Sequence, residues 1–385
     1  MRNKATIKTN SVNLSYWELK HYFKGVDLIV IGSGIVGLNT AIYFKKNNPK
    51  AKVLVLEKGI LPAGASTKNA GFACFGSPSE LLSDLKKVSE ETVWETVKMR
   101  WDGLKLLRKN LDDKNIGFKQ HGGFELFNTK GQFDNCNESV FYLNKKAKEY
   151  IGRKNVYTSV NSQIKSFGFK TVKGMILNSE EGQIDTSKMF NALLQLAQKE
   201  NISILNGVDI TKISDTKSGV ELQSNLGVFK SKKVVVAVNG FAKELLQIKD
   251  VAPARAQVLI TKPIQNLKVK GTFHYDEGFY YFRNIDDRIL FGGGRNLDLK
   301  GETTTQIAVT PKIQNQLETL LKTVIIPNQK FEIEHRWAGI MGVGAEKKPI
   351  IKHYSPNVVC AVRMGGMGVA IGSLVGKEAA KLIAD

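Results

Sequence analysis

Three glycines near the start of the chain, Gly32, Gly34 and Gly37, have the GxGxxG spacing of a turn that binds a pyrophosphate. The first glycine permits the tight bend, the second lets backbone amides approach the phosphates, and the third lets a helix pack closely on a strand. Glu57 lies twenty residues after Gly37, where a carboxylate typically meets the ribose hydroxyl of an adenine nucleotide. These residues predict a dinucleotide site, and they leave open whether the nucleotide is FAD or NAD.

The segments around these glycines agree with a dinucleotide site. The apolar run 26–31 predicts a buried parallel strand, and an apolar-periodic helix follows through Ala41 and Tyr43. A second strand over 52–56 ends at Glu57. The stretch 59–76 is rich in Gly, Ala and Ser, so it offers backbone amides where a flat ligand passes closely.

Later segments predict that the chain returns to the same sheet. A helix beginning at Asp185 or Thr186 leads into strands through Ile202 and Ile210, strands near 219–222 and 227–230 follow, and a third buried strand ends at 239–240. The C-terminal segment predicts a buried strand, a glycine turn at 366–368 and a helix, whose N-terminus would suit an electronegative ligand edge.

These elements predict an α/β fold, α+β overall, with a discontinuous Rossmann-like nucleotide-binding domain and a substrate domain built on an antiparallel sheet. The nucleotide-binding domain would comprise residues 25–80, 182–245 and 333–385. The substrate domain would comprise 81–181 and 246–332, where alternation at Tyr280, Phe282, Ile289 and Phe291 indicates an antiparallel sheet. Residues 1–24 would be a docking segment, because the aromatic side chains of Tyr16, Trp17, Tyr22 and Phe23 would not suit a free tail.

Composition narrows the function classes. The 385 residues are 42% hydrophobic and 24% charged, which is globular composition. The net charge of +20 keeps nucleic-acid binding open, but scattered lysines without interleaved aromatics favour a solvated surface. Cys74, Cys136 and Cys360 lie far apart without a CxxC pair, so we expect reduced thiols and no metal site. Without a membrane-spanning run or a signal-peptide core, we expect a cytoplasmic protein.

Motifs along nearly the whole chain resemble the D-amino-acid oxidase, glycine oxidase and sarcosine oxidase family of FAD enzymes. They occur in order as GSGIVG with Glu57, GASTKNAGF, GQID before a helix, VVVAVNG, YYFRNIDDRILFGGG, HRWAG and MGGMGVAIG. Within this family, SYWE, FRNIDDRILFGGG and RWAG are most similar to the branch of gamma-glutamylputrescine oxidoreductase-like members.

The resemblance implies FAD bound in an extended pose. It is expected to be non-covalent, because Cys360 lies inside an apolar strand and no cysteine follows the tryptophan segment. Amide dipoles of the last glycine turn would stabilise negative charge on the reduced flavin. The implied cofactor residues are Gly32, Gly34, Ile35, Val36 and Gly37 at the pyrophosphate, Glu57 and Lys58 at the ribose, Ala65, Ser66, Asn69, Ala70, Gly71 and Phe72 toward the flavin, Val208 at the adenine, Asn239 and Gly240 after the third strand, and Gly366, Met367, Gly368, Val369, Ala370 and Ile371 at the pyrimidine end of the ring.

The resemblance also implies a reaction. Hydride passes from a carbon bearing an amine to flavin N5, water hydrolyses the resulting imine, and oxygen or another acceptor restores the flavin. The substrate would be a small primary or secondary amine or amino acid, and no dedicated base is required. Two alternatives stay open: oxidation of an aminomethyl group on a modified tRNA base, which the positive charge would favour, and a flavoprotein that binds without catalysis.

The chain departs from its relatives where they clamp a substrate carboxylate. Amino-acid-oxidising relatives have an arginine just after the WAG segment, where this chain has Ile340-Met341-Gly342, and glycine oxidases have another where this chain has Gly366. The putrescine-type branch often has a histidine where Met367 stands. Four arginines are candidates to replace the clamp: Arg283, Arg295, Arg336 and Arg363.

Four residues are candidates for the catalytic site: Tyr281, Arg283, His335 and Met341. Strand alternation puts Tyr281 on the same face as Arg283 and opposite Tyr280. The competing interpretation packs Tyr281 in the core and pairs Arg283 with Asp286 or Asp287 at the surface. Alternation also sends His335 and Trp337 to one side and Arg336 to the other, and a lone histidine is more often structural than functional.

Overall fold

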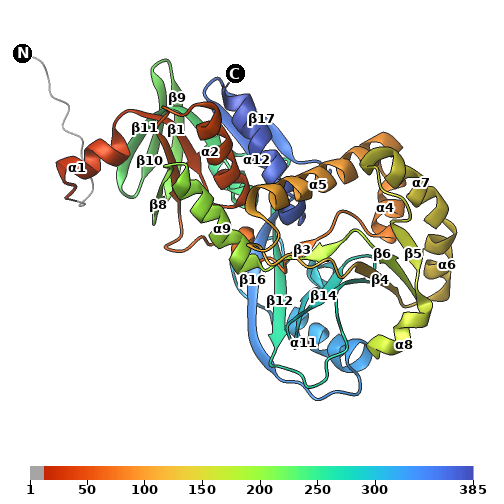
Figure 1. Ribbon diagram of the computed structural model, residues 1–385. Helices are drawn as coiled ribbons and strands as arrows, with labels where there is room; N and C mark the ends of the chain where they lie inside the picture. The colour runs from red at the N-terminus through yellow and green to blue at the C-terminus, as the bar shows by residue number, and fades with distance from the viewer. Residues whose placement is uncertain (1–12, 385) are drawn as a thin grey trace, which may run out of the picture.

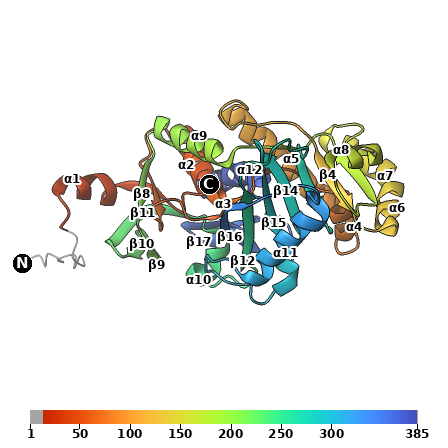
Figure 2. The same ribbon diagram turned by 90° about the horizontal axis from the view of Figure 1, so that it is seen from below.

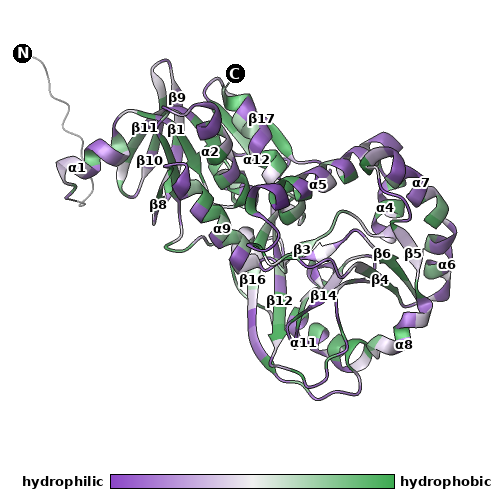
Figure 3. Cartoon of the chain, viewed as in Figure 1, coloured by the Kyte–Doolittle hydropathy of each residue, from purple (hydrophilic) through white to green (hydrophobic). Residues whose placement is uncertain are grey.

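Two eight-stranded sheets dominate the computed structural model, which describes residues 13–384 (Figure 1). The first sheet lies near both termini, and the second lies at the opposite end of the molecule (Figures 1 and 2). A two-stranded sheet of β3 (Phe72–Ala73) and β7 (Gly182–Gln183) lies between them. Strands β4 and β6 are strongly apolar, whereas the outer helices alternate between polar and apolar residues, as amphipathic helices do (Figure 3).

The first sheet has the order β17-β18-β11-β1-β2-β8. Strand β1 pairs in parallel with β2 and β11, and its apolar residues, including Leu28 and Val30, are fully buried. The predicted segment 227–230 and the third buried strand form one long strand, β11, whose first half pairs with a β9–β10 hairpin. The strands are β1 (Val26–Ile31), β2 (Val53–Glu57), β8 (Ser203–Asn206), β9 (Ile210–Thr216), β10 (Gly219–Ser224), β11 (Gly227–Val236), β17 (Ile350–Ser355) and β18 (Val358–Val362).

Helices from distant parts of the sequence pack together beside this sheet. Helix α12 (Gly368–Ala384) contacts both α2 (Ile35–Asn47) and α5 (Glu90–Leu111), and α2 also contacts α9 (Thr186–Lys199). Glycines allow the close approach: a Cβ atom on Gly103 of α5 would lie 2.2 Å from the carbonyl oxygen of Ala370. The two helices that follow the glycine turns, α2 and α12, therefore share one core.

The second sheet has the order β16-β12-β15-β14-β13-β4-β6-β5 and is antiparallel except for the β13–β4 pair. One face packs an aromatic cluster that includes Phe273, Phe282 and Phe291. The strands are β4 (Gly123–Phe127), β5 (Tyr157–Ser159), β6 (Gly174–Asn178), β12 (Ala252–Thr261), β13 (Thr272–Tyr275), β14 (Tyr280–Ile285), β15 (Arg288–Gly293) and β16 (Ile333–Val343). Strand β16 pairs with β12 along its length, although we placed residues 333–343 in the nucleotide-binding domain.

The remaining helices lie mainly around the second sheet. Trp94 and Trp101 of α5 are buried in the hydrophobic core. The helices are α3 (Ala65–Lys68), α4 (Pro78–Leu85), α6 (Lys130–Glu138), α7 (Val140–Ile151), α8 (Ile164–Phe167), α10 (Ala242–Leu246) and α11 (Pro311–Leu320), with short turns η2 (Asn161–Gln163), η3 (Asn239–Phe241), η4 (Arg295–Asp298) and η5 (Leu321–Ile325). None of the helices in residues 13–384 has the length and apolar character needed to cross a membrane.

The N-terminal segment docks only by its second half. Phe23, at the end of η1 (Leu19–Phe23), stacks on Phe229 with ring centroids 4.2 Å apart, and Tyr22 packs against the same core. Tyr16 and Trp17, both in α1 (Tyr16–Glu18), are 60% and 72% exposed. The prediction that all four aromatics dock was therefore wrong for these two, which contact each other instead. Residues 1–12 of the predicted docking segment lie outside the described part of the chain.

Candidate functional site

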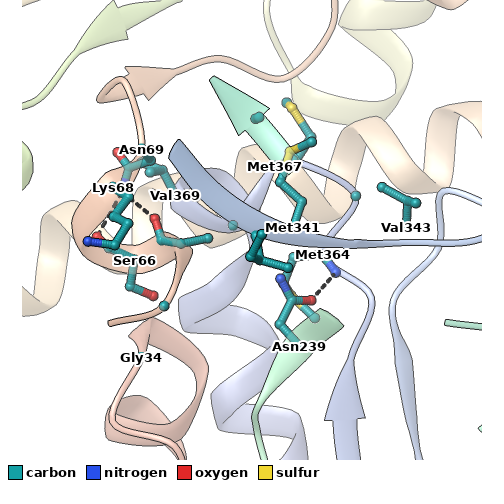
Figure 4. A pocket seen from close by; sticks show the side chains of 18 of the residues that line it. Gly34, Ser66, Lys68, Asn69, Asn239, Met341, Val343, Met364, Met367 and Val369 are labelled. Atoms are coloured by element: carbon teal, nitrogen blue, oxygen red, sulfur yellow. Dashed lines mark hydrogen bonds between the residues drawn. The ribbon is translucent and has the colours of Figure 1, made fainter. Parts of the chain in front are cut away.

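A large cavity, approximately 1430 Å³ in volume, is lined by residues of both sheets. One wall of the cavity comes from the turns after β1, β2, β11 and β18. The opposite end, called the wide end below, is bounded by β12–β15 and η4. Figure 4 shows this wall, with Ser66 beside Gly34 and Met341 between Asn239 and Met367. In an open α/β sheet a crevice at the carboxyl ends of the strands is where ligands bind.

The first glycine turn has no room for side chains. Gly32 has a φ of +102°, which disfavours other residues, and its Cβ would lie 2.8 Å from the carbonyl oxygen of Ala237, just after β11. A Cβ on Gly37 would lie 1.9 Å from the carbonyl oxygen of Gly32, so α2 packs directly on the turn. A Cβ on Gly34 would lie 2.9 Å from Ser66 Oγ, which itself accepts the Ile35 amide at 2.9 Å.

Glu57 ends β2 at the cavity, buried and held from three sides. Oε2 accepts hydrogen bonds from the amide of Ser33 at 3.0 Å and from its hydroxyl at 2.8 Å, and Oε1 accepts the Gly59 amide at 3.0 Å. The Val208 amide donates to the Glu57 carbonyl at 2.9 Å, which brings Val208 to the same end of the cavity. Lys58 is exposed and pairs with Asp209 at 3.0 Å.

Two asparagines shape the loops that line the centre of the cavity. Asn69 donates to the Ser66 carbonyl at 2.8 Å, and its Oδ1 accepts the Gly71 amide at 2.9 Å. Asn239, with a φ of +48°, accepts the amides of Arg363 and Met364 at 3.1 and 3.2 Å (Figure 4). Asn239 thereby ties the end of β11 to the C-terminal glycine turn.

The C-terminal turn presents a bare backbone to the cavity. Gly366 has a φ of +84°, and the first turn of α12 begins at Gly368. The first amides of a helix have no partner within the helix and carry a partial positive charge. The sulfur of Met341 lies 3.3 Å from the position of a Cβ on Gly366, so Met341 covers this turn from β16.

These features suit FAD. At the three glycine positions and in the C-terminal turn, a Cβ atom would clash with neighbouring atoms or strain the backbone. The free helix amides at the first turn can donate to a pyrophosphate, and those at the C-terminal turn can donate to an electronegative ring edge. Glu57 offers a buried carboxylate at the adenosine end. The predicted residues that line the cavity are Gly32, Gly34, Ile35, Val36, Glu57, Lys58, Ala65, Ser66, Asn69, Ala70, Gly71, Phe72, Val208, Asn239, Gly366, Met367, Gly368, Val369 and Ala370.

Three predicted cofactor residues do not line the cavity. Gly37 serves the packing of α2, and Ile371 is buried beneath the first turn of α12. A Cβ on Gly240 would lie 2.4 Å from the carbonyl oxygen of Met341, so Gly240 permits β16 to pass closely. Cofactor contact by these three residues stays a prediction, and sequence spacing does not separate a residue that touches a ligand from one that lets the backbone approach.

One face of the second sheet forms the wide end of the cavity. His274, Tyr281, Gly292 and Val258 lie opposite one another on four consecutive strands. Gly292 leaves space for the Tyr281 ring, since its Cβ would lie 2.7 Å from Tyr281 Cε2. Burial raises the pKa of Tyr281 to about 12, which keeps the hydroxyl protonated at neutral pH. Tyr280 points to the opposite face and packs on Phe291, as alternation predicts.

Of the four candidate arginines, only Arg295 lines the cavity. It follows β15 in η4, and its Nε is buried without a hydrogen-bond partner. Burial lowers its pKa, but a guanidinium remains charged. The Oδ1 of the adjacent Asn296 is also buried and unpartnered. Within residues 13–384, no carboxylate oxygen lies within 4.0 Å of the Arg295 guanidinium nitrogens.

The other three arginines do not line the cavity, although the Nε of Arg283 is also buried without a hydrogen-bond partner. Arg336 donates to Gln314 and Glu318 away from the cavity, and Arg363 donates to the Lys348 carbonyl at 3.0 Å. Arg283 is buried behind Gly71, where its Nη2 would lie 2.8 Å from a Cβ, and burial lowers its pKa to about 10.

Two predicted catalytic positions therefore need correction. Arg283 shares a face with Tyr281 but does not line the cavity, and the surface ion pair with Asp286 or Asp287 was also wrong, because the side chain is buried. His335 is exposed near the start of β16 and stacks on Trp337, so it lies outside the cavity. The cavity instead receives the later part of β16, including Met341.

Sequence reasoning missed several cavity residues. His274 and Cys74 line the wide end, and Met364 lies beside the terminal turn. The sequence did carry a signal for His274, because alternation along the strand in GTFHYDEG points His274 to the opposite face of the sheet from Phe273. Placing Cys74 in the cavity required knowledge that β3 pairs with β7, and strands of two residues leave no pattern in the sequence from which that pairing could be predicted.

Comparison with known proteins gives a consistent result. The family described as "DAO: FAD dependent oxidoreductase" matches residues 27–382. Probable oxidoreductase OrdL of Haemophilus influenzae is 19% identical over 93% of this chain and 82% of its own length. Gamma-glutamylputrescine oxidoreductase of Escherichia coli is 24% identical, with coverage of 93% and 83%.

Solved structures share the fold. L-proline dehydrogenase from P. horikoshii superposes with a TM-score of 0.73 at 19% identity, covering 93% of each chain. Glycine oxidase from Bacillus cereus superposes with a TM-score of 0.72 at 15% identity, covering 93% of this chain and 95% of its own.

Proposed function

Because the chain belongs to the DAO family of FAD-dependent oxidoreductases, we propose that it oxidises the C–N bond of a small primary or secondary amine or amino acid. The observation that carries this proposal is the extent of the cavity. Ligand pockets typically occupy about 300–1,000 Å³, and this cavity of approximately 1430 Å³ continues past the glycine turns to Tyr281 and Arg295. It has room for the cofactor and for a small substrate together.

FAD supplies the electron sink, which takes a hydride from the carbon that bears the amine. The chain's own task is to orient the substrate and exclude water. The wall from Val258 through Gly292 to Tyr281 is apolar apart from the Tyr281 hydroxyl, so it limits hydration of the reacting carbon. Reduced cofactor would then be reoxidised by oxygen or another acceptor.

Arg295 points to a substrate that carries a carboxylate. Its Nε is buried without a hydrogen-bond partner, no carboxylate of the described residues pairs with the guanidinium, and a buried polar group without a partner is unfavourable. A substrate carboxylate would supply that partner through charge-assisted hydrogen bonds. The neighbouring Asn296 Oδ1 is an unused acceptor for an amine N–H. Within this proposal, Arg295 takes the place of the arginines that relatives have near the WAG segment and the terminal turn.

An anaerobic titration tests the proposed reaction. Purified protein carrying FAD is mixed with amino acids, simple amines and hydroxy acids, and the oxidised flavin absorbance is followed. We expect bleaching by a member of the amine or amino-acid group and recovery on adding oxygen or an artificial acceptor. Bleaching by hydroxy acids alone would contradict C–N oxidation. A flavin that dithionite reduces but no member of the panel reduces would support the non-catalytic alternative.

A further inference from the structure

Three metal-binding side chains from separate segments meet at the wide end of the cavity. In the two-stranded sheet, Ala73 pairs with Gly182, so the residues that continue these strands, Cys74 and Glu181, come together. His274 reaches the same place from β13, where it lies opposite Tyr281. One ligand atom each from Cys74, Glu181 and His274 lie within 4.8 Å of one another.

The spacing of these atoms is close to that of a zinc site. Glu181 Oε2 lies 3.6 Å from His274 Nε2. Tetrahedral zinc, with bonds of about 2.0–2.3 Å, places its ligand atoms roughly 3.3–3.8 Å apart. Side-chain movements of about 1 Å would therefore bring all three groups into bonding distance.

The surroundings hold these groups ready for a ligand. Glu181 is almost fully buried, and its Oε1 accepts the amides of Phe75 and Gly76 at 3.0 and 3.3 Å. Position 123 must be glycine to leave room for Glu181 Oε2, because a Cβ on Gly123 would lie 2.0 Å from that oxygen. His274 Nε2 is buried and has no hydrogen-bond partner. A carboxylate oriented by backbone amides and an imidazole nitrogen that makes no hydrogen bond are both typical of groups that bind a metal ion.

Charge and access also suit a divalent ion. A thiolate from Cys74 and the Glu181 carboxylate would neutralise a dication, which removes the large cost of burying net charge. Cys74 and His274 both line the cavity, so an ion has an entry path and a fourth coordination position that faces it. Three protein ligands with one open position is the arrangement of zinc sites that exchange a water or substrate ligand.

We propose that Cys74, Glu181 and His274 bind one Zn²⁺ at the wide end of the cavity, with a water molecule as the fourth ligand. The ion would lie beside Phe72, whose ring contacts His274 with centroids 5.4 Å apart. This site is distinct from the glycine turns, and its occupancy does not depend on the amine reaction.

Zinc binding is measured on the FAD-loaded protein after chelator treatment, by competition with a coloured chelator. We expect one Zn²⁺ per chain, and affinity lowered by roughly 100-fold in Cys74→Ser and in His274→Gln. Cys136→Ser is the matched control, because Cys136 is equally buried but lies in α6, and it should bind zinc as the unmodified protein does.

Cobalt gives a second measurement that does not need the variants to fold. Co²⁺ added to the unmodified protein should produce d–d absorption of four-coordinate intensity, at wavelengths beyond the flavin bands, and one equivalent of Zn²⁺ should abolish it. Absence of saturable zinc binding by the unmodified protein would overturn the proposal. So would folded, flavin-containing Cys74→Ser and His274→Gln variants that bind zinc with unchanged affinity.

Discussion

The two walls of the cavity are built from different parts of the chain. The wall at the glycine turns is mostly backbone: Gly32, Gly34 and Gly366 have no side chains, and Asn69 and Asn239 use theirs to fix the loops. The wall on the second sheet is made of side chains, with Tyr281 on β14 and Arg295 just after β15. The first wall suits a cofactor shared by a whole family, and the second can change its chemistry by single substitutions.

This contrast predicts that the backbone wall tolerates almost no added volume. Gly37→Ala places a methyl group 1.9 Å from the Gly32 carbonyl oxygen, and overpacking against backbone costs about 1–3 kcal/mol. We expect the purified variant to retain roughly a tenth of its FAD or less, measured by the ratio of flavin to protein absorbance. Gly131→Ala in α6, where a Cβ meets nothing within 4 Å, is the control. A fully yellow Gly37→Ala protein would break the comparison.

The side-chain wall should instead control substrate choice. Hydrogen bonds to a charged group contribute about 1.5–3 kcal/mol, so Arg295→Met should lower kcat/KM for an amino-acid substrate roughly 100-fold. FAD content and activity on an amine without a carboxylate should stay unchanged. Arg336→Met is the control, because Arg336 bonds Gln314 and Glu318 outside the cavity. Equal losses on both substrate types would show that Arg295 does not read a carboxylate.

A partly buried cluster of charged side chains at the edge of the cavity should set the acid stability of this region. Burial would raise the pKa of Glu80, but Arg100 at 3.2 Å and Lys347 at 2.7 Å lower it to about 2. A carboxyl group with a lowered pKa stabilises the fold above about pH 4.5 and loses that contribution as the pH falls toward 2. We expect Glu80→Gln to cost about 2 kcal/mol at pH 7 and clearly less at pH 3.5.

Urea unfolding at both pH values measures this difference. Glu95→Gln is the control, because Glu95 forms only an exposed pair with Lys348 and such pairs contribute little. A penalty for Glu80→Gln that does not change with pH would contradict the assigned pKa.

We expect the smallest effect when hydrogen bonds that fix the backbone wall are removed and no side-chain volume is added. Asn239→Ala removes the acceptor for two amides of the C-terminal turn, at about 1.4 kcal/mol or a tenfold loss of FAD affinity. Flavin release on dilution measures it. Asn161→Ala is the control, because it removes a comparable acceptor, for the Met175 amide on β6, at a position that does not line the cavity. If both variants release FAD equally, the Asn239 bridge has no special part in the cofactor wall.

The same contrast explains what the sequence could predict. The spacing of the glycines, the ends of the strands and the carboxylate of Glu57 at the end of β2 all reflect backbone geometry. Most of the predicted cofactor positions from Gly32 to Ala370 therefore line the cavity. Side-chain contacts across the second sheet depend on register between strands far apart in sequence. Alternation gave the face of His335 but not its distance from the cavity, which it does not line. Arg295 was one of four candidate arginines, and Arg283 was preferred until β15 and η4 were placed.

A crystal structure of the FAD-loaded protein tests the central claim most directly. We expect the pyrophosphate at the amides following Gly34 and the adenosine ribose at Glu57. We expect the flavin ring between Phe72 and Met341 beside the turn at Gly366, with one ring face toward Tyr281. Electron density for FAD elsewhere, or a cavity closed by side chains in protein that carries no flavin, would contradict the account.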